Sequence, residues 1–72
     1  MLESSPMELI INGEPRQFSD VLTVAELVAL LGYTGKRIAV ERNGEIVPRS
    51  RHADAVLTAG DHLEIVVAVG GG

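Results

Sequence analysis

Apolar residues recur with a helical period in the segment 22–32. The positions that share one face of this helix are Val24, Leu27, Val28 and Leu31. Thr23 and Glu26 are spaced as the two partners of a capping box, in which each side chain satisfies a backbone N–H of the other residue. Gly32 stands where a left-handed residue commonly ends a helix. The pattern therefore predicts one amphipathic helix.

Shorter apolar runs on both sides of this segment are typical of strands. We predict strands at Met7–Ile11, Glu14–Phe18, Ile38–Arg42, Glu45–Val47 and Leu63–Val69. The first four form two hairpins through Asn12-Gly13 and Asn43-Gly44, because Asn-Gly readily adopts the positive φ of a type I′ turn. Pro15 cannot donate a ladder hydrogen bond, which places the second strand at an edge. Within the connector that follows Pro48, we expect one helical turn at residues 53–57.

Together these elements predict an α+β roll, in which one main helix covers a mixed sheet of four to five strands. With a period of two, the residues predicted to face the helix are Leu9, Ile11, Ile38, Val40, Leu63, Ile65 and Val67. The opposite face carries Glu8, Glu41 and Glu64 together with Ile10, Ala39, Val66 and Ala68. This outer apolar patch is either a docking surface or the ordinary apolar exposure of a small domain.

Composition narrows the possible partners. The 72 residues correspond to one small domain, and the absence of cysteine rules out disulfides and side-chain thiols as carriers of a cargo. A net charge of −4 and only two aromatic residues argue against nucleic acid. No apolar stretch is long enough to span a membrane, and residues 1–6 do not resemble a signal peptide. We therefore expect a cytoplasmic protein with a flexible leader at residues 1–6.

The sequence ends in three glycines, Gly70, Gly71 and Gly72, directly after the last predicted strand. Residues 70–72 are expected to form a flexible tail beyond the domain at residues 7–69. Without Cβ atoms such a tail can enter a narrow enzyme site, and the carboxylate of its last residue then becomes the candidate reactive group. A carboxylate must first be activated, and the segment 32–36 is too short for a Walker phosphate loop. Any ATP site is therefore expected on a partner.

Other candidate sites are weaker. His52 and His62, with Asp54 and Asp61 nearby, lack metal-ligand spacing, so we predict surface and turn roles for them and no metal site. The alternation of Ser50, His52 and Asp54 in a short connector does not provide the buried, oriented base of a hydrolase. Arg49 and Arg51 either contact an acidic rim on a partner or are simply solvated charges.

Several of these segments occur together in a known family. They are Asn12-Gly13, the helix start at residues 23–27, the segment 46–49, Gly60-Asp61 and the terminal Gly-Gly. Over residues 7–72 the chain resembles the ThiS family, the sulfur carrier proteins of thiamine biosynthesis. The resemblance implies a β-grasp, ubiquitin-like fold whose first and last strands lie side by side and parallel in the sheet centre. It also implies a carrier and not an enzyme.

The resemblance further implies a reaction cycle on the tail. An adenylating enzyme of the ubiquitin-activating type (ThiF-like) would use ATP to convert the carboxylate of Gly72, beside Gly71, to an acyl-adenylate. A sulfur-donating protein would supply sulfur for a thiocarboxylate, and thiazole synthase (ThiG-like) would receive it, while the carrier itself binds no cofactor. Residues predicted to contact partners are Gly70, Ile10, Val66, Ala68 and Arg49. The alternatives are a MoaD-like carrier for molybdopterin synthesis, a ubiquitin-like protein modifier, or a passive interaction module.

Overall fold

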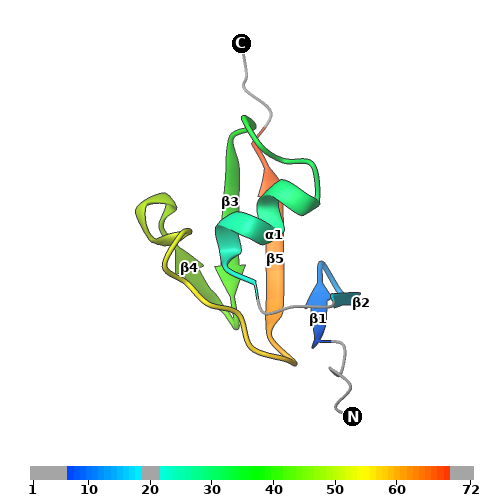
Figure 1. The fold of residues 1–72 in the computed structure, drawn as a ribbon. Helices are drawn as coiled ribbons and strands as arrows, with labels where there is room; N and C mark the ends of the chain where they lie inside the picture. The colour runs from blue at the N-terminus through cyan, green and yellow to red at the C-terminus, as the bar shows by residue number, and fades with distance from the viewer. Residues whose placement is uncertain (1–6, 19–21, 69–72) are drawn as a thin grey trace.

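Five strands and one α-helix make up the domain, which we describe from a computed structural model covering residues 7–18 and 22–68. The elements are β1 (Met7–Ile11), β2 (Glu14–Phe18), α1 (Val24–Leu30), β3 (Ile38–Arg42), β4 (Glu45–Val47), the 3₁₀ helix η1 (Arg49–Arg51) and β5 (His62–Val67). Figure 1 shows α1 lying across one face of the sheet. The predicted leader at residues 1–6 and the predicted tail at residues 70–72 lie outside the described residues.

The strand order β2-β1-β5-β3-β4 places β5 in the centre of a mixed sheet. Strand β1 pairs with β5 in parallel, with Ile10 opposite His62, whereas β3 pairs with β5 antiparallel over five residue pairs. The α+β roll is therefore confirmed, and so is the parallel central pair implied by the β-grasp resemblance. Strand β2, which contains Pro15, lies at an edge as predicted.

Both Asn-Gly hairpin turns are confirmed by their backbone angles. The φ angles are 52° and 84° in the first turn and 51° and 88° in the second. These paired positive values are those of a type I′ turn, whose twist matches the twist of the strands that it joins. The sequence pattern thus identified both hairpins correctly.

Helix α1 has the predicted cap at each end. The N–H of Glu26 donates to Oγ1 of Thr23 at 3.2 Å, and the N–H of Thr23 donates to Oε1 of Glu26 at 2.9 Å. At the other end Gly32 has a φ of 84°, and the N–H of Tyr33 donates to the carbonyl of Val28 at 3.0 Å. The N–H of Gly32 bonds to the carbonyl of residue 29, which completes a Schellman motif.

The core lies between α1 and the inner face of the sheet. Its fully buried side chains are Leu9, Val24, Leu27, Val40, Leu57 and Leu63. Ile11 and Ile65 are also buried, as predicted, whereas Ile38 is only partly buried. Val67, also predicted to face the helix, is 38% exposed. Val67 and Ile38 form the last pair of the β3–β5 ladder, at the margin of the sheet.

The predicted helical turn at residues 53–57 is wrong. The one short helix in the described connector is η1, which follows Pro48 with its fixed φ of −62°. Residues 55–57 are instead laid against the start of α1, where Val24 donates to the carbonyl of Ala55 at 2.9 Å and Leu57 donates to that of Leu22 at 2.7 Å. This path pairs backbone groups of the two segments and buries the side chain of Leu57 in the core.

Candidate functional site at the end of the central strand

Strand β5 runs from the core to the end of the sheet at which the β3–β5 ladder finishes. Leu63 and Ile65 are buried between the sheet and α1, and their packing holds this strand in place. Its far end is held by the N–H of Ala68, which donates to the carbonyl of Arg37 at 2.8 Å. The described chain stops at residue 68, so the predicted reactive residues Gly71 and Gly72, and Gly70 before them, lie outside the described residues. The structure thus describes the anchor of the predicted tail.

Asn12 adds a second fixing point on the other side of β5. Its Nδ2 donates to the carbonyl of Ile65 at 3.2 Å, and its Oδ1 accepts from the N–H of Ile65 at 2.8 Å. The residue pairs of β1 with β5 end at Leu63, so the side-chain amide of Asn12 extends the contact to Ile65, two residues further along β5. The type I′ turn and the support of β5 therefore depend on the same asparagine, a role that sequence analysis did not identify.

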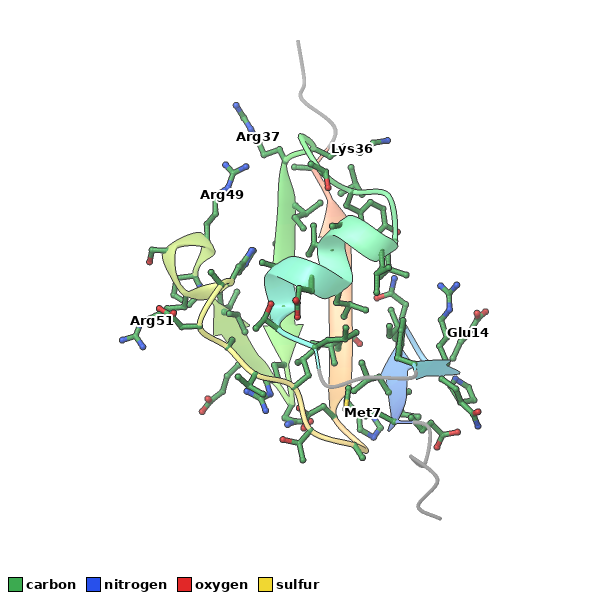
Figure 2. The ribbon with its side chains drawn as sticks, viewed as in Figure 1. Met7, Glu14, Lys36, Arg37, Arg49 and Arg51 are labelled. Carbon is green, nitrogen blue, oxygen red and sulfur yellow. The ribbon has the colours of Figure 1, made fainter. Side chains whose placement is uncertain are left out.

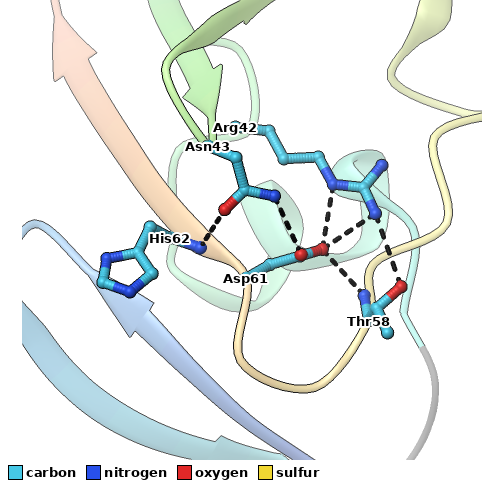
Figure 3. A network of polar contacts seen from close by, with 5 residues as sticks. All are labelled: Arg42, Asn43, Thr58, Asp61 and His62. Carbon is cyan, nitrogen blue, oxygen red and sulfur yellow. Dashed lines mark hydrogen bonds and ion pairs between the residues drawn. The ribbon is translucent and has the colours of Figure 1, made fainter.

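Asp61 organises a polar cluster at the start of β5 (Figure 3). Its carboxylate accepts from Nε and an Nη of Arg42 at 2.9 and 2.8 Å, from Nδ2 of Asn43 at 3.0 Å, and from the N–H of Thr58 at 2.8 Å. Oδ1 of Asn43 in turn accepts from the N–H of His62 at 2.9 Å. The cluster joins the β3–β4 turn to the beginning of the central strand.

The contacts of Asp61 set its charge. Burial by itself raises the pKa of this carboxyl, since only 8% of the residue is exposed. The hydrogen bonds from Thr58, Asn43 and Arg42, together with the charge of Arg42, outweigh burial and hold the pKa below its usual value. Asp61 is therefore ionised at neutral pH. The sequence predicted only a turn role for Asp61, because no local signal indicates a partner 19 residues away.

The outer face of the sheet brings together only part of the predicted patch. Ala39 lies opposite Val66 in the β3–β5 ladder, and both are exposed, Val66 by 61%. Ala68 follows Val66 with the same parity and is exposed as well. Ile10 is half-buried and lies opposite His62 of β5. On this face of β5 the next residues are Glu64 and then Val66, so Glu64 lies between Ile10 and Val66. The contiguous apolar surface is thus the Ala39, Val66 and Ala68 group next to the end of β5.

Acidic residues border this apolar group. Glu41 lies directly opposite Glu64, and Ile46 of β4 lies opposite Glu41 and is 65% exposed. Like charges directly opposite each other on paired strands are destabilising, so the Glu41–Glu64 pair does not contribute to the stability of the isolated domain. The two glutamates were predicted on this face, whereas Ile46 was not, although its outward position follows from the same alternation.

Basic side chains lie towards the end of the molecule where β5 finishes. Figure 2 labels Lys36 and Arg37 on the loop before β3 and Arg49 on η1, all at this end of the domain. Arg49, predicted to contact a partner, is exposed on the first residue of η1. Among the described residues, the one ion pair joins Arg42 to Asp61, so these three cations are not neutralised there.

The described residues present no arrangement of ligands for a metal ion. No group of three or more His, Cys, Asp or Glu side chains gathers in residues 7–18 and 22–68. His52 instead makes a 3.1 Å contact between Nε2 and the carbonyl of Val47, which ties η1 to β4. Over the same described ranges, the structure has no helix long and apolar enough to cross a membrane.

Comparisons with known proteins agree with this arrangement. The chain is 37% identical over 65 residues to the sulfur carrier protein ThiS of Bacillus subtilis, covering 89% of this chain and 98% of that protein. A crystal structure of the thiamine biosynthesis protein ThiS from Geobacter metallireducens superposes with a TM-score of 0.77 at 33% identity, over 92% of this chain and 100% of that one.

A longer relative places a similar segment within a larger protein. A thiazole synthase from Paramagnetospirillum magneticum is 52% identical over 66 residues, which are 92% of this chain but 20% of that protein. The chain therefore spans about a fifth of the length of this relative. The ThiS family model matches residues 9–72. With these matches and the parallel β1–β5 centre of the sheet, the chain belongs to the ThiS family.

Proposed function

We propose that this protein is a sulfur carrier of thiamine biosynthesis and acts as a co-substrate, not as a catalyst. The observation that carries the proposal is the family match over residues 9–72, which includes the glycine tail. It is supported by the position of β5, which is fixed by β3 on one side and by β1 and Asn12 on the other. The cytoplasm remains the predicted compartment.

The chemistry takes place on the carboxylate of Gly72. An adenylating enzyme of the ubiquitin-activating type transfers AMP from ATP to this carboxylate and releases pyrophosphate. A sulfur nucleophile at the oxidation level of hydrosulfide, supplied by a sulfur-donating protein, then displaces AMP and leaves a thiocarboxylate. Thiazole synthase takes up the sulfur at the sulfide oxidation level, and an oxygen nucleophile takes its place on the acyl carbon, which restores the carboxylate. Adenylation is needed because the α-carboxyl group is ionised at neutral pH and is a poor electrophile.

The folded domain provides recognition for these enzymes. The exposed Ala39, Val66 and Ala68 group adjoins the end of β5, so a partner that covers it also stands beside the tail. We propose that Val66, Ala68 and Arg49 contact partners, with Ile10 at the margin of the surface. The match to thiazole synthases supports the thiamine pathway over a molybdopterin pathway, because one such enzyme contains a segment similar to this chain.

The test uses the purified protein, the cognate adenylating enzyme, ATP and a sulfur source. We expect pyrophosphate release and an intact mass that increases by the replacement of one oxygen with sulfur. A variant with one alanine added after Gly72 should give neither product, because the added Cβ must pass the same narrow site. Removing one of the three glycines leaves a terminal Gly-Gly pair and serves as the matched control, which should still release pyrophosphate. Full activity of the extended variant would contradict the proposal.

A further inference from the structure

A hollow of about 310 Å³ lies between α1, the loop that follows it and η1. We call it the basic hollow. Its apolar wall includes Val28, Tyr33 and Ile38, and its positively charged or titratable side chains are Lys36, Arg49 and His52. No carboxylate of the described residues lines it. Val28 and Tyr33 are held together by the Schellman motif at the end of α1, so this wall is part of the folded scaffold.

The charge of the hollow is opposite to that of the whole chain. The net charge is −4, from ten acidic and six basic residues. Four of the six basic residues are concentrated in two short segments, namely Lys36, Arg37, Arg49 and Arg51. Within residues 7–18 and 22–68, neither Lys36 nor Arg49 forms an ion pair, and both side chains are exposed.

The basic hollow is also next to the end of the central strand. Ile38, which lines it, pairs with Val67, and the carbonyl of Arg37 accepts from the N–H of Ala68. Figure 2 shows Lys36, Arg37 and Arg49 around the end of the molecule at which β5 finishes. A protein that takes up the glycine tail would therefore approach this hollow at the same time.

We propose that the basic hollow is a docking site for an acidic segment of thiazole synthase, in which an apolar side chain neighbours a carboxylate. This inference rests on the proposed function. The carboxylate would pair with Lys36 and Arg49, while the apolar side chain would displace water from Val28, Tyr33 and Ile38. A small inorganic anion would use the cations alone and leave the apolar wall hydrated, so the mixed lining fits a peptide segment better.

The test measures binding of the full chain to cognate thiazole synthase by calorimetry at about 50 and about 300 mM NaCl. The double variant Lys36→Glu/Arg49→Glu should bind roughly tenfold more weakly at the lower salt and should lose most of the salt dependence. Ala53→Phe, at an exposed position in the lining, should weaken binding by filling the hollow and should leave the salt dependence unchanged. Arg16→Glu on β2, at the edge of the sheet opposite β4, is a charge-reversal control for each single replacement, Lys36→Glu and Arg49→Glu.

An affinity of the double variant equal to that of wild type, or to that of Arg16→Glu, overturns the inference. Pyrophosphate release with the adenylating enzyme separates this result from a failure of the proposed function. If the wild-type protein releases none, the carrier function itself is wrong. If all variants are adenylated normally and bind the synthase as wild type does, only the role of the basic hollow is wrong. Circular dichroism verifies that each variant is folded.

Discussion

Replacing Asp61 by alanine would remove an acceptor that serves three donor residues. Its carboxylate accepts from Arg42 at 2.8 and 2.9 Å, from Asn43 at 3.0 Å and from the N–H of Thr58 at 2.8 Å. Only 8% of Asp61 is exposed, so water cannot take over all of these bonds. The change would leave a guanidinium group, a side-chain amide and a backbone N–H without their shared partner.

The expected loss follows from these contacts. Hydrogen bonds to a charged acceptor contribute about 1.5–3 kcal/mol each, and removing one partner of a buried ion pair costs about 3–5 kcal/mol. The side chain of Arg42 is 28% exposed, so solvent offsets part of that loss. We expect Asp61→Ala to lower the free energy of unfolding by about 2–4 kcal/mol. For a domain of this size the melting temperature would fall by roughly 10–30 °C.

Asp61→Asn removes the negative charge of the side chain and keeps nearly the same shape. The asparagine keeps one acceptor oxygen but loses the negative charge, so we expect a loss of about 1–2 kcal/mol at pH 7. In the wild type, the hydrogen bonds and the charge of Arg42 place the folded-state pKa below the unfolded value. The stability that the ionised group contributes is therefore complete above about pH 4, the unfolded-state pKa, and is lost as the pH falls through the folded-state pKa. The difference between wild type and Asp61→Asn should shrink over that interval.

The assay is urea denaturation followed by circular dichroism at about pH 7, 5 and 3. Asp54→Asn is the matched control, because Asp54 is exposed and its side chain forms no hydrogen bond with the described residues. We expect this control to unfold at the wild-type urea concentration throughout. The reasoning is refuted if Asp61→Asn is as stable as wild type at pH 7, or if the gap between them is the same at pH 3 as at pH 7.

Substitutions at four further positions probe the support of β5, the helix cap and the outer face. Asn12→Gly keeps the positive φ of the turn but loses both hydrogen bonds to Ile65. We expect the free energy of unfolding to fall by about 1–2 kcal/mol and the Ile65 amide to exchange faster. Unchanged exchange would count against the role of Asn12 in holding β5. Thr23→Ala should cost about 1 kcal/mol in urea denaturation, with Thr23→Ser close to wild type; an equally stable alanine variant would exclude a capping role. Val66→Glu should weaken binding to thiazole synthase roughly tenfold while leaving the urea midpoint unchanged. Ile10→Glu should also lower stability, because Ile10 is half-buried. Equal affinity of Val66→Glu and wild type would rule out the docking surface.

Much of the fold could be predicted because its signals are local. The capping box of Thr23 and Glu26 and the two Asn-Gly turns each depend on residues within a few positions of one another. The helical turn expected at residues 53–57 failed for the opposite reason. Leu57 is needed in the core, and its N–H bonds to Leu22, which is 35 positions away in the sequence. Composition alone could not show that contact.

The site was predictable to a similar extent. Strand alternation placed Val66 and Ala68 on the outer face correctly, but it could not show that Glu64 separates Ile10 from them, because that depends on the β1–β5 register. The bonds from Asn12 to Ile65 span 53 residues and were equally invisible. The chemistry assigned to Gly72 came from the family resemblance and stays a proposal, since that residue lies outside the described ranges.

The pairing of β1 with β5 also determines when the domain can fold during synthesis. These strands come from opposite ends of the described chain, and β5 supplies the buried Leu63 and Ile65 in the middle of the sheet. A nascent chain that has not yet exposed β5 outside the ribosome lacks the strand that joins its two hairpins, and such long-range pairings form slowly. Enzymes that recognise the folded domain would therefore not bind a nascent chain in which β5 has not yet emerged.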